Sequence, residues 1–344
     1  MPRDHRRGGR RRRDRHRGRA RADRCRRAAA PPCAFPTRRL RRRGSPVSAS
    51  TILVRVVSYR DPELLRTVAS AWEQADRPER IRFAIVQQFG PETAEQLEPL
   101  RGDPRVRVFR TEWSSARGLG WARRMTDRMR VDESFALQID AHTRFAPGWD
   151  TALIDRWESL DDPRAVLSCY PGAFTPLDEH RVELREAGPH LIVPAGTDQY
   201  GLPRQDGGPA ASAGATGLLV SGGFQFSAGA LCSELEQVRD VMIADEYVQA
   251  LRLFTHGWNV RAPGSVPLFH LYRRDRPHDA HGFARDFAST PDTAAAAERL
   301  IARSLATARA IISGDGAGAL GAVRSRQEFE ERLRGLTANP SDYS

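Results

Sequence analysis

The sequence predicts an α/β fold with a mostly parallel central sheet and helices on both of its faces. Short apolar runs typical of buried strands alternate with segments whose apolar residues recur at helical spacing. This alternation extends from about residue 51 to residue 169, and strands that alternate with helices are typical of a parallel sheet. The chain has 344 residues, which is enough for one large domain or two ordinary ones.

The first strand–helix–strand unit is predicted over residues 52–87. Residues 52–57 are nearly all apolar, as in a central parallel strand. Asp61 and Pro62 then predict a helix start, with Asp61 as the N-cap and Pro62 in the first turn. Residues 82–87 form the second predicted strand, so the unit has an ordinary length.

The later elements are predicted from the same two kinds of spacing. Strands are expected at residues 106–109, 135–139, 165–169, 260 and 266–269, and residues 218–226 are expected to be ordered. Helices are expected at residues 118–129, 149–160, 245–255, 294–312 and 325–336. Pro and Gly are frequent from residue 171 to about residue 215, which predicts a long loop that serves as a lid or a binding loop.

Basic charge is concentrated in the first 50 residues, which hold 19 Arg and 3 Asp. The rest of the chain is acidic, with a net charge of about −5, and the chain contains no Lys. Few apolar residues and no periodicity predict that residues 1–50 are disordered. This Arg-rich head is either an arm for nucleic acid or another anionic surface, or an extension outside the fold.

The four Cys residues form no CxxC pair and do not have the spacing of a zinc site. We therefore expect Cys169 and Cys232 to be buried free thiols and the protein to be cytoplasmic. No run approaches the roughly 20 apolar residues of a membrane span.

The most informative motif is the pair Asp140 and His142, which follows the predicted strand at residues 135–139. Residues two apart in an extended chain point the same way, so both side chains can reach one ion or one substrate. Ligands collect at the carboxyl ends of strands in open α/β sheets, and a carboxylate with an imidazole there suits a divalent ion. A turn capped by Asp140, with His142 at the surface, explains the same residues.

Four further motifs carry candidate chemistry, and each also has a purely structural explanation. Residues 58–60 form a strand-to-helix loop of the kind that holds nucleotides, or a plain helix entry. The Gly and Arg residues of 117–123 could bind a phosphate, or they could simply cap a helix. They lack the spacing of a dinucleotide-binding or NTPase loop. The tandem Gly residues within 221–224 would let a ligand approach the backbone. The acids at 245–246, which belong to the same motif, either face that ligand or only complement a helix dipole. His270 ends a short predicted apolar strand, where it is either a ligand of the bound ion or substrate or a residue with only a structural role.

The order of these motifs resembles that of retaining glycosyltransferases of the GT-A type. The resemblance is to the GlcNAc-transferase family typified by the cytoplasmic hydroxyproline-modifying enzyme of eukaryotes, and more distantly to the polypeptide GalNAc-transferases. It covers about residues 51–337, and its most specific part is the Gln-Ile-Asp-x-His-x-x-Phe run at residues 138–145. Supporting stretches lie at residues 57–61, 118–123, 147–150, 222–227, 252–257, 270–273 and 320–324.

The resemblance implies a GT-A-like, Rossmann-like fold and transfer of a sugar, GlcNAc by expectation, from a UDP-sugar to a hydroxyl acceptor with retention. It implies that Mn²⁺ or Mg²⁺ is held by Asp140, His142 and His270. It assigns the donor to a set of loop residues: Ser58, Tyr59, Arg60, Arg117, Gly118, Arg123, Asp140, Gly222 and Gly223. The catalytic acid would be Glu246 or Asp245; Ala244 stands where the family carries Gly, so a backbone role for Gly is in doubt there.

These inferences predict a head at residues 1–50, one catalytic domain at residues 51–337 and a tail at residues 338–344. Two other functions remain open. The protein could bind nucleic acid through its Arg-rich head, although the acidic body argues against that partner. It could also be a metal-dependent phosphoesterase, although no second carboxylate cluster with metal spacing is present.

Overall fold

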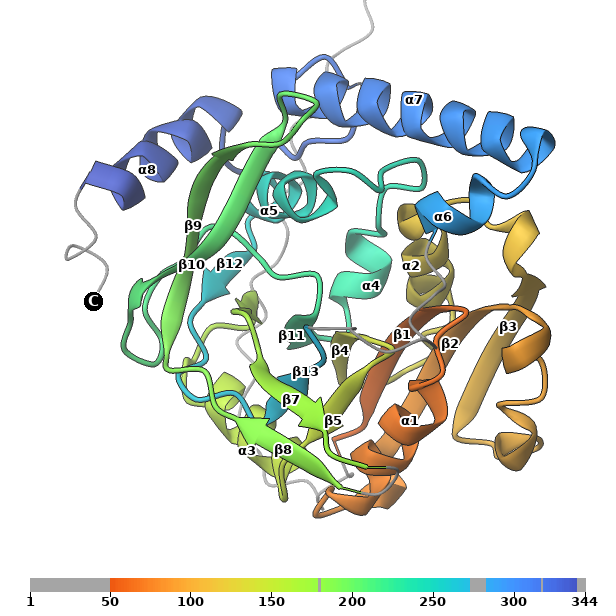
Figure 1. The fold of residues 1–344 in the computed structure, drawn as a ribbon. Helices are drawn as coiled ribbons and strands as arrows, with labels where there is room; N and C mark the ends of the chain where they lie inside the picture. The colour runs from red at the N-terminus through yellow and green to blue at the C-terminus, as the bar shows by residue number, and fades with distance from the viewer. Residues whose placement is uncertain (1–49, 179–180, 273–282, 317, 339–344) are drawn as a thin grey trace, which may run out of the picture. The chain divides into compact units, whose positions relative to one another are not determined.

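The computed structural model describes residues 50–178, 181–272, 283–316 and 318–338. A seven-stranded sheet forms the centre of this part of the chain, in the strand order β12-β6-β11-β4-β1-β2-β3 (Figure 1). The Arg-rich head, apart from its last residue, and nearly all of the predicted tail lie outside the described residues, and so do Cys25 and Cys33. Cys169 and Cys232 are buried free thiols, as predicted.

The strands of this sheet run parallel with one exception. The parallel strands are β1 (Ile52–Tyr59), β2 (Ile81–Phe89), β3 (Val106–Glu112), β4 (Phe135–Asp140), β6 (Ala165–Leu167) and β12 (Asn259–Arg261). The exception is β11 (Phe224–Ala228), which is antiparallel to both β4 and β6. Within the ordered stretch predicted at residues 218–226, the strand begins at Phe224, so the tandem Gly residues precede it.

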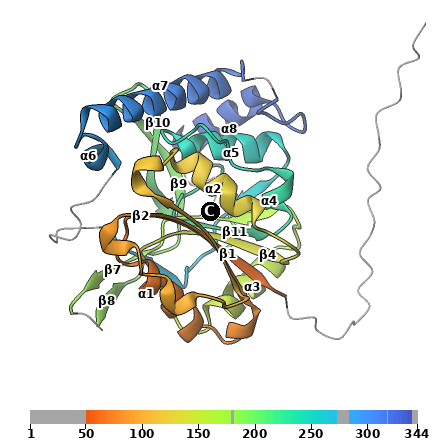
Figure 2. The same cartoon turned by 90° about the vertical axis from the view of Figure 1, so that its right-hand side faces the viewer.

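Helices cover both faces of the sheet, as Figure 2 shows. On one face lie α1 (Leu64–Glu73) and α3 (Trp149–Glu158); on the other lie α2 (Leu119–Arg128), α4 (Leu231–Glu234) and α5 (Asp245–Thr255). The fully buried side chains of Trp149 and Leu64 pack with apolar residues of β1, β2 and β4. The predicted α/β class, with a mostly parallel sheet between two helical layers, is confirmed.

The loop predicted for residues 171–215 was wrong, because this segment forms two antiparallel pairs of strands. The first pair is β7 (Gly172–Pro176) and β8 (Val182–Arg185), which belong to a four-stranded sheet with β13 (Leu268–His270) and β5 (Thr143–Phe145). The second pair is β9 (His190–Thr197) and β10 (Pro203–Ala210), a separate two-stranded sheet. Register shifts in β10 accommodate its Pro and Gly residues, which obscure the strand signal in the sequence.

The C-terminal part is helical, as predicted. It comprises α6 (Phe283–Phe287), α7 (Pro291–Ser313) and α8 (Arg326–Ala338). Short 3-10 turns are η1 (Pro78–Arg80), η2 (Pro91–Thr93), η3 (Glu98–Leu100) and η4 (Trp113–Ser115). Among the described helices, none combines the length and the apolar character needed to cross a bilayer.

Candidate functional site

Asp140, His142 and His270 form a cluster at the carboxyl end of β4. Asp140 ends β4, and the antiparallel pairing of β13 with β5 places His270 opposite Thr143, which is adjacent to His142. His270 Nε2 lies 3.0 Å from Asp140 Oδ2, and the two imidazole centroids are 4.6 Å apart. One ligand atom from each residue lies within 4.8 Å of the others, so the three side chains converge on one point.

Asp61 holds His142 in place from the loop that follows β1. Its Oδ2 lies 2.8 Å from His142 Nδ1, and its side chain is buried. The predicted N-cap at Asp61 is displaced, because α1 begins at Leu64 with Glu63 as the N-cap residue. Asp61 still makes a capping contact, since its Oδ1 accepts a hydrogen bond of 2.9 Å from Glu63 N–H. A carboxylate that fixes one imidazole nitrogen leaves the other directed at the cluster.

The chemistry of the cluster fits a divalent metal ion. One carboxylate and two imidazoles offer oxygen and nitrogen donors at a separation that a single ion bridges. Gly223 leaves room beside them, since a Cβ at this position would lie 3.1 Å from Asp140 Oδ2. Burial raises the pKa of Asp140, but the hydrogen bond with His270 and the charges of His142, His270 and Arg123 outweigh it and hold that pKa below its usual range.

A cavity of about 340 Å³ adjoins the cluster on the side of β1 and α2. Asp140 and His142 line it together with Tyr59 at the end of β1 and Gly118 before α2. Gly118 has a φ of +91°, a left-handed conformation that favours Gly, and a Cβ there would lie 3.3 Å from Met242 Sδ. The other lining residues are Val57, Asp61, Gln88, Leu119, Ala141, Met242 and Phe283.

Three other predicted donor residues lie beside this cavity but do not line it. Ser58 is buried in β1. Arg60 forms an ion pair with Glu92 at 2.8 Å and a second with Asp286 at 3.3 Å. Arg117 is exposed, and its guanidinium lies 5.6 Å from the ring centre of Trp121.

The tandem Gly segment and the start of α5 form a wall next to the cluster, where a Cβ at Gly223 would lie 3.6 Å from the His270 ring. Arg123 of α2 forms an ion pair with Asp245 and donates a hydrogen bond of 3.2 Å to the Gly222 carbonyl. A Cβ at Gly222 would lie 2.7 Å from Arg123 Nη2, so Gly is required for this approach. The N-cap residue of α5, Ala244, has a φ of 55°, so the backbone is left-handed at the position where a Gly was expected.

Glu246 faces the interior of the site. Its carboxylate accepts hydrogen bonds from Gly222 N–H and, over 3.0 Å, from the side-chain amide of Gln205 in β10. Burial raises the pKa of Glu246 to about 7, and the neighbouring charge of Asp245 adds to the rise. Asp245 is engaged by Arg123 instead, so the two candidate acids have different surroundings.

Two residues at this site, Asp61 and Gln205, were not predicted as site residues. Asp61 belongs to a stretch that matches the family, and the pairing of Val57 with Asp140 places its loop beside the end of β4. Gln205 comes from the segment predicted as a loop, so the sequence carried no signal for its position. Arg273, in another matching stretch, lies outside the described residues.

Comparisons with known proteins agree with this architecture. Residues 91–305 match the family model "Glycosyltransferase (GlcNAc)". No curated protein sequence matches the chain. Among solved structures, GalNAc-T7 with UDP, GalNAc and Mn²⁺ has a TM-score of 0.54 and 16% identity over 85% of this chain and 57% of that chain. S. aureus TarS with UDP-GlcNAc has a TM-score of 0.48 and 12% identity over 86% of this chain and 73% of that one.

The likeness to GalNAc-T7 shows the fold alone, and the chain spans little more than half of that protein's length. The family match is the evidence for family membership, because it extends over more than half of the present chain and includes the cluster residues Asp140, His142 and His270. The chain therefore belongs to the glycosyltransferase (GlcNAc) family and has a GT-A-like fold.

Proposed function

We propose that the protein transfers a sugar, GlcNAc in the first instance, from a UDP-sugar to a hydroxyl acceptor with retention, and that it requires a divalent metal ion. The observation that carries this proposal is the cluster of Asp140, His142 and His270 on the rim of the 340 Å³ cavity. A cavity of this size suits a small ligand. GalNAc-T7 was crystallised with UDP and Mn²⁺, which agrees with this choice of ligands.

In this proposal Asp140, His142 and His270 hold Mn²⁺ or Mg²⁺. When bound, the ion neutralises the negative charge that develops on the departing diphosphate. Asp61 orients His142 by accepting a hydrogen bond from its Nδ1–H, which leaves Nε2 as the ligand atom. Gly223 keeps the space beside Asp140 open for the diphosphate.

The nucleotide would occupy the 340 Å³ cavity. The aromatic rings of Tyr59 and Phe283, with centroids 6.2 Å apart, offer apolar contacts for the base. Gly118 lets the backbone approach the phosphates at the start of α2, where the helix dipole favours negative charge. Ser58, Arg60 and Arg117 lie around this cavity and would act on the donor from a greater distance than Tyr59.

The reacting groups would meet between the cluster and Glu246. The acceptor oxygen forms a bond to the anomeric carbon, and the bond from that carbon to the diphosphate oxygen breaks with its electron pair. The hydroxyl proton leaves with the diphosphate. We assign Glu246 to the hydroxyl groups of the donor sugar or the acceptor, because its carboxylate faces the interior. Arg123 holds Asp245 and the Gly222 carbonyl and so positions this wall.

A donor survey tests the proposal. The purified protein is incubated with Mn²⁺ and either UDP-GlcNAc, UDP-GalNAc, UDP-glucose or GDP-mannose, and release of the nucleoside diphosphate is measured. We expect UDP release to be fastest from UDP-GlcNAc, to stop with EDTA and to resume with Mn²⁺. Release of UMP would instead indicate a phosphoesterase. Release of GDP from GDP-mannose, with no UDP from any UDP-sugar, would contradict the proposal that the donor is a UDP-sugar.

A pair of variants connects this activity to the cluster. Asp140→Asn removes a charged metal ligand and should lower turnover by at least about a hundredfold. Asp155→Asn, on the exposed side of α3, is the matched control and should leave turnover unchanged. Equal activity of the two variants would remove the cluster from the mechanism.

A further inference from the structure

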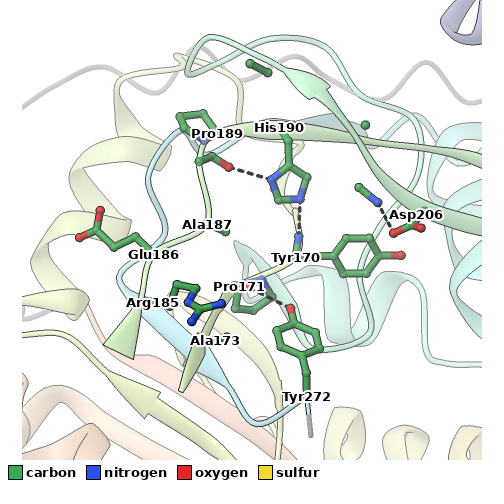
Figure 3. A pocket seen from close by; sticks show the side chains of 14 residues that line it. Tyr170, Pro171, Ala173, Arg185, Glu186, Ala187, Pro189, His190, Asp206 and Tyr272 are labelled. Atoms are coloured by element: carbon green, nitrogen blue, oxygen red, sulfur yellow. Dashed lines mark hydrogen bonds between the residues drawn. The ribbon is translucent and has the colours of Figure 1, made fainter. Parts of the chain in front are cut away.

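A second, larger cavity of about 670 Å³ lies beside the candidate active site, between the end of β8 and the β9–β10 pair (Figure 3). Tyr272 in its wall packs against His270 of the cluster, with ring centroids 4.4 Å apart and the rings tilted by 58°. Tyr170, also in its wall, accepts a hydrogen bond of 3.3 Å from Gln205, and the same amide contacts Glu246. Two lining residues of the cavity therefore connect it to the site, Tyr272 through its contact with His270 and Tyr170 through Gln205, which contacts Glu246.

The aromatic wall of this cavity is held rigidly by hydrogen bonds. The Tyr272 hydroxyl donates to the Pro171 carbonyl over 2.8 Å, although the residue is 50% exposed. His190 Nδ1 lies 2.8 Å from the Gly188 carbonyl, and its Nε2 accepts the Tyr170 N–H over 3.3 Å. Its ring also stacks on that of Tyr170, at 6.1 Å and 20°. Exposed aromatic faces that are fixed before a ligand arrives bind flat apolar surfaces at low entropic cost.

The charged groups of the cavity are few and nearly balanced. Arg185 and Asp206 line it, while the Glu186 side chain points away from it in Figure 3. Arg185 and Asp206 are exposed, and Asp206 Oδ1 accepts the Gly207 N–H over 2.7 Å. One guanidinium and one carboxylate suit a neutral ligand whose hydroxyl groups both donate and accept hydrogen bonds.

We infer that this cavity binds the acceptor of the transfer reaction and that the acceptor is a neutral saccharide; the inference rests on the function proposed above. The apolar face of a sugar ring would lie on Tyr272, and its hydroxyl groups would contact Asp206 and Arg185. Tyr272 then places the acceptor hydroxyl next to the cluster, across from the donor cavity. That hydroxyl oxygen forms the new bond to the anomeric carbon, and its proton leaves with UDP.

The test uses the full chain with Mn²⁺ and UDP-GlcNAc and compares five acceptors. Three are the neutral trisaccharides maltotriose, cellotriose and triacetylchitotriose; the others are trigalacturonic acid and a ten-residue peptide with Ser, Thr and hydroxyproline. We expect transfer to at least one neutral trisaccharide. Asp206→Asn and Arg185→Ala should each raise KM for it by about tenfold or more, with little change in KM for UDP-GlcNAc.

Two features of this design separate the possible outcomes. Asp206→Asn keeps the hydrogen bond from Gly207 N–H and is exposed, so loss of folding does not explain its effect. Glu183→Gln, an exposed β8 residue outside the cavity, is the matched control. Transfer only to the peptide or the anionic sugar, or equal acceptor KM for all variants, would overturn the inference.

Binding alone separates this inference from the proposed function. Saturation-transfer NMR with each neutral trisaccharide needs no turnover, and a signal that Arg185→Ala abolishes would support the cavity assignment even if no UDP-sugar were cleaved. Cleavage of UDP-GlcNAc without any trisaccharide signal would support the proposed function and overturn the acceptor inference.

Discussion

Glu246 shows how a single residue's surroundings set its chemistry. Burial and the adjacent Asp245 raise its pKa to about 7, whereas the hydrogen bonds from Gly222 N–H and Gln205 favour its charged form. A carboxyl group that titrates near neutral pH suits a role in proton transfer or in binding sugar hydroxyls. The sequence placed two acids at this helix start, and only their contacts distinguish them.

We predict that Glu246→Gln lowers turnover by about a hundredfold, because the reacting sugar loses a charged partner. Asp245→Asn should have a smaller effect, since Asp245 contacts Arg123. Normal turnover by Glu246→Gln with an inactive Asp245→Asn would move the role to Asp245. Normal turnover by both would remove the start of α5 from the mechanism.

The same variant has a predicted effect on pH-dependent stability. The folded pKa of Glu246, about 7, lies above the usual 4.5, so the folded state binds the proton more tightly. The contribution of this group to stability is therefore greatest below pH 4.5 and is lost as the pH rises towards 7. Glu246→Gln cannot titrate and should gain on the order of 1–3 kcal/mol relative to the wild type across that window. Urea unfolding at several pH values measures this difference, and a constant difference would contradict the raised pKa.

Asp61 carries the third prediction at the residue scale. Without the Asp61 carboxylate, the His142 ring is no longer fixed, and we expect Asp61→Ala to weaken Mn²⁺ binding by about 10–100-fold. Asp61→Asn retains an acceptor oxygen and should have a smaller effect. The measurement is an EPR titration of free Mn²⁺, which needs no turnover. Unchanged affinity in Asp61→Ala would show that His142 is oriented by other contacts or is not a ligand.

At the scale of elements, β1 and α2 are connected by a buried ion pair. Arg55 and Asp127 are both almost inaccessible, and Asp127 also accepts the Gln237 N–H over 2.8 Å. Removing one partner leaves an uncompensated buried charge, so Asp127→Ala should lower the free energy of unfolding by roughly 3–5 kcal/mol. The double replacement Arg55→Met with Asp127→Leu should cost less. Denaturant unfolding measures both, and a larger loss in the double variant would contradict this account.

The sequence predicted the elements that have strong periodicity and missed those whose local signal is weak. Residues 52–57 and 135–139 are apolar runs and form strands, and α5 begins and ends where predicted. The strands of residues 171–215 were missed because their Pro and Gly residues weaken the local signal, even though β7 pairs with β8 and β9 with β10 inside the same segment. The contact of Asp61 with His142 was missed for a different reason, since the two residues are 81 positions apart in the sequence.

At the scale of the whole molecule, the site is assembled from segments that are far apart in the sequence. The position of Asp140 and His142 at a strand end followed from local spacing. His270 as the third member followed only from the family resemblance, because the pairing of β13 with β5 cannot be read locally. The 670 Å³ cavity, with Gln205 beside it, depends on strands that the sequence did not predict, so it could not be anticipated.

We also propose that residues 51–337 form one catalytic domain and that the Arg-rich head is dispensable for transfer. Limited trypsin digestion should remove the head, which contains most of the closely spaced Arg residues, and leave a stable fragment that still releases UDP. Mass spectrometry of the fragments provides the measurement. Cleavage near residue 171 into two independently folded halves would contradict the single domain.

The central claim is that one metal ion joins Asp140, His142 and His270 to the diphosphate of a bound nucleotide. A crystal grown with UDP and MnCl₂ tests it through the anomalous signal of manganese. We predict one peak about 2.0–2.3 Å from a ligand atom of each of the three residues, with UDP in the 340 Å³ cavity. A manganese peak elsewhere, or UDP bound without any peak at the cluster, would contradict the claim.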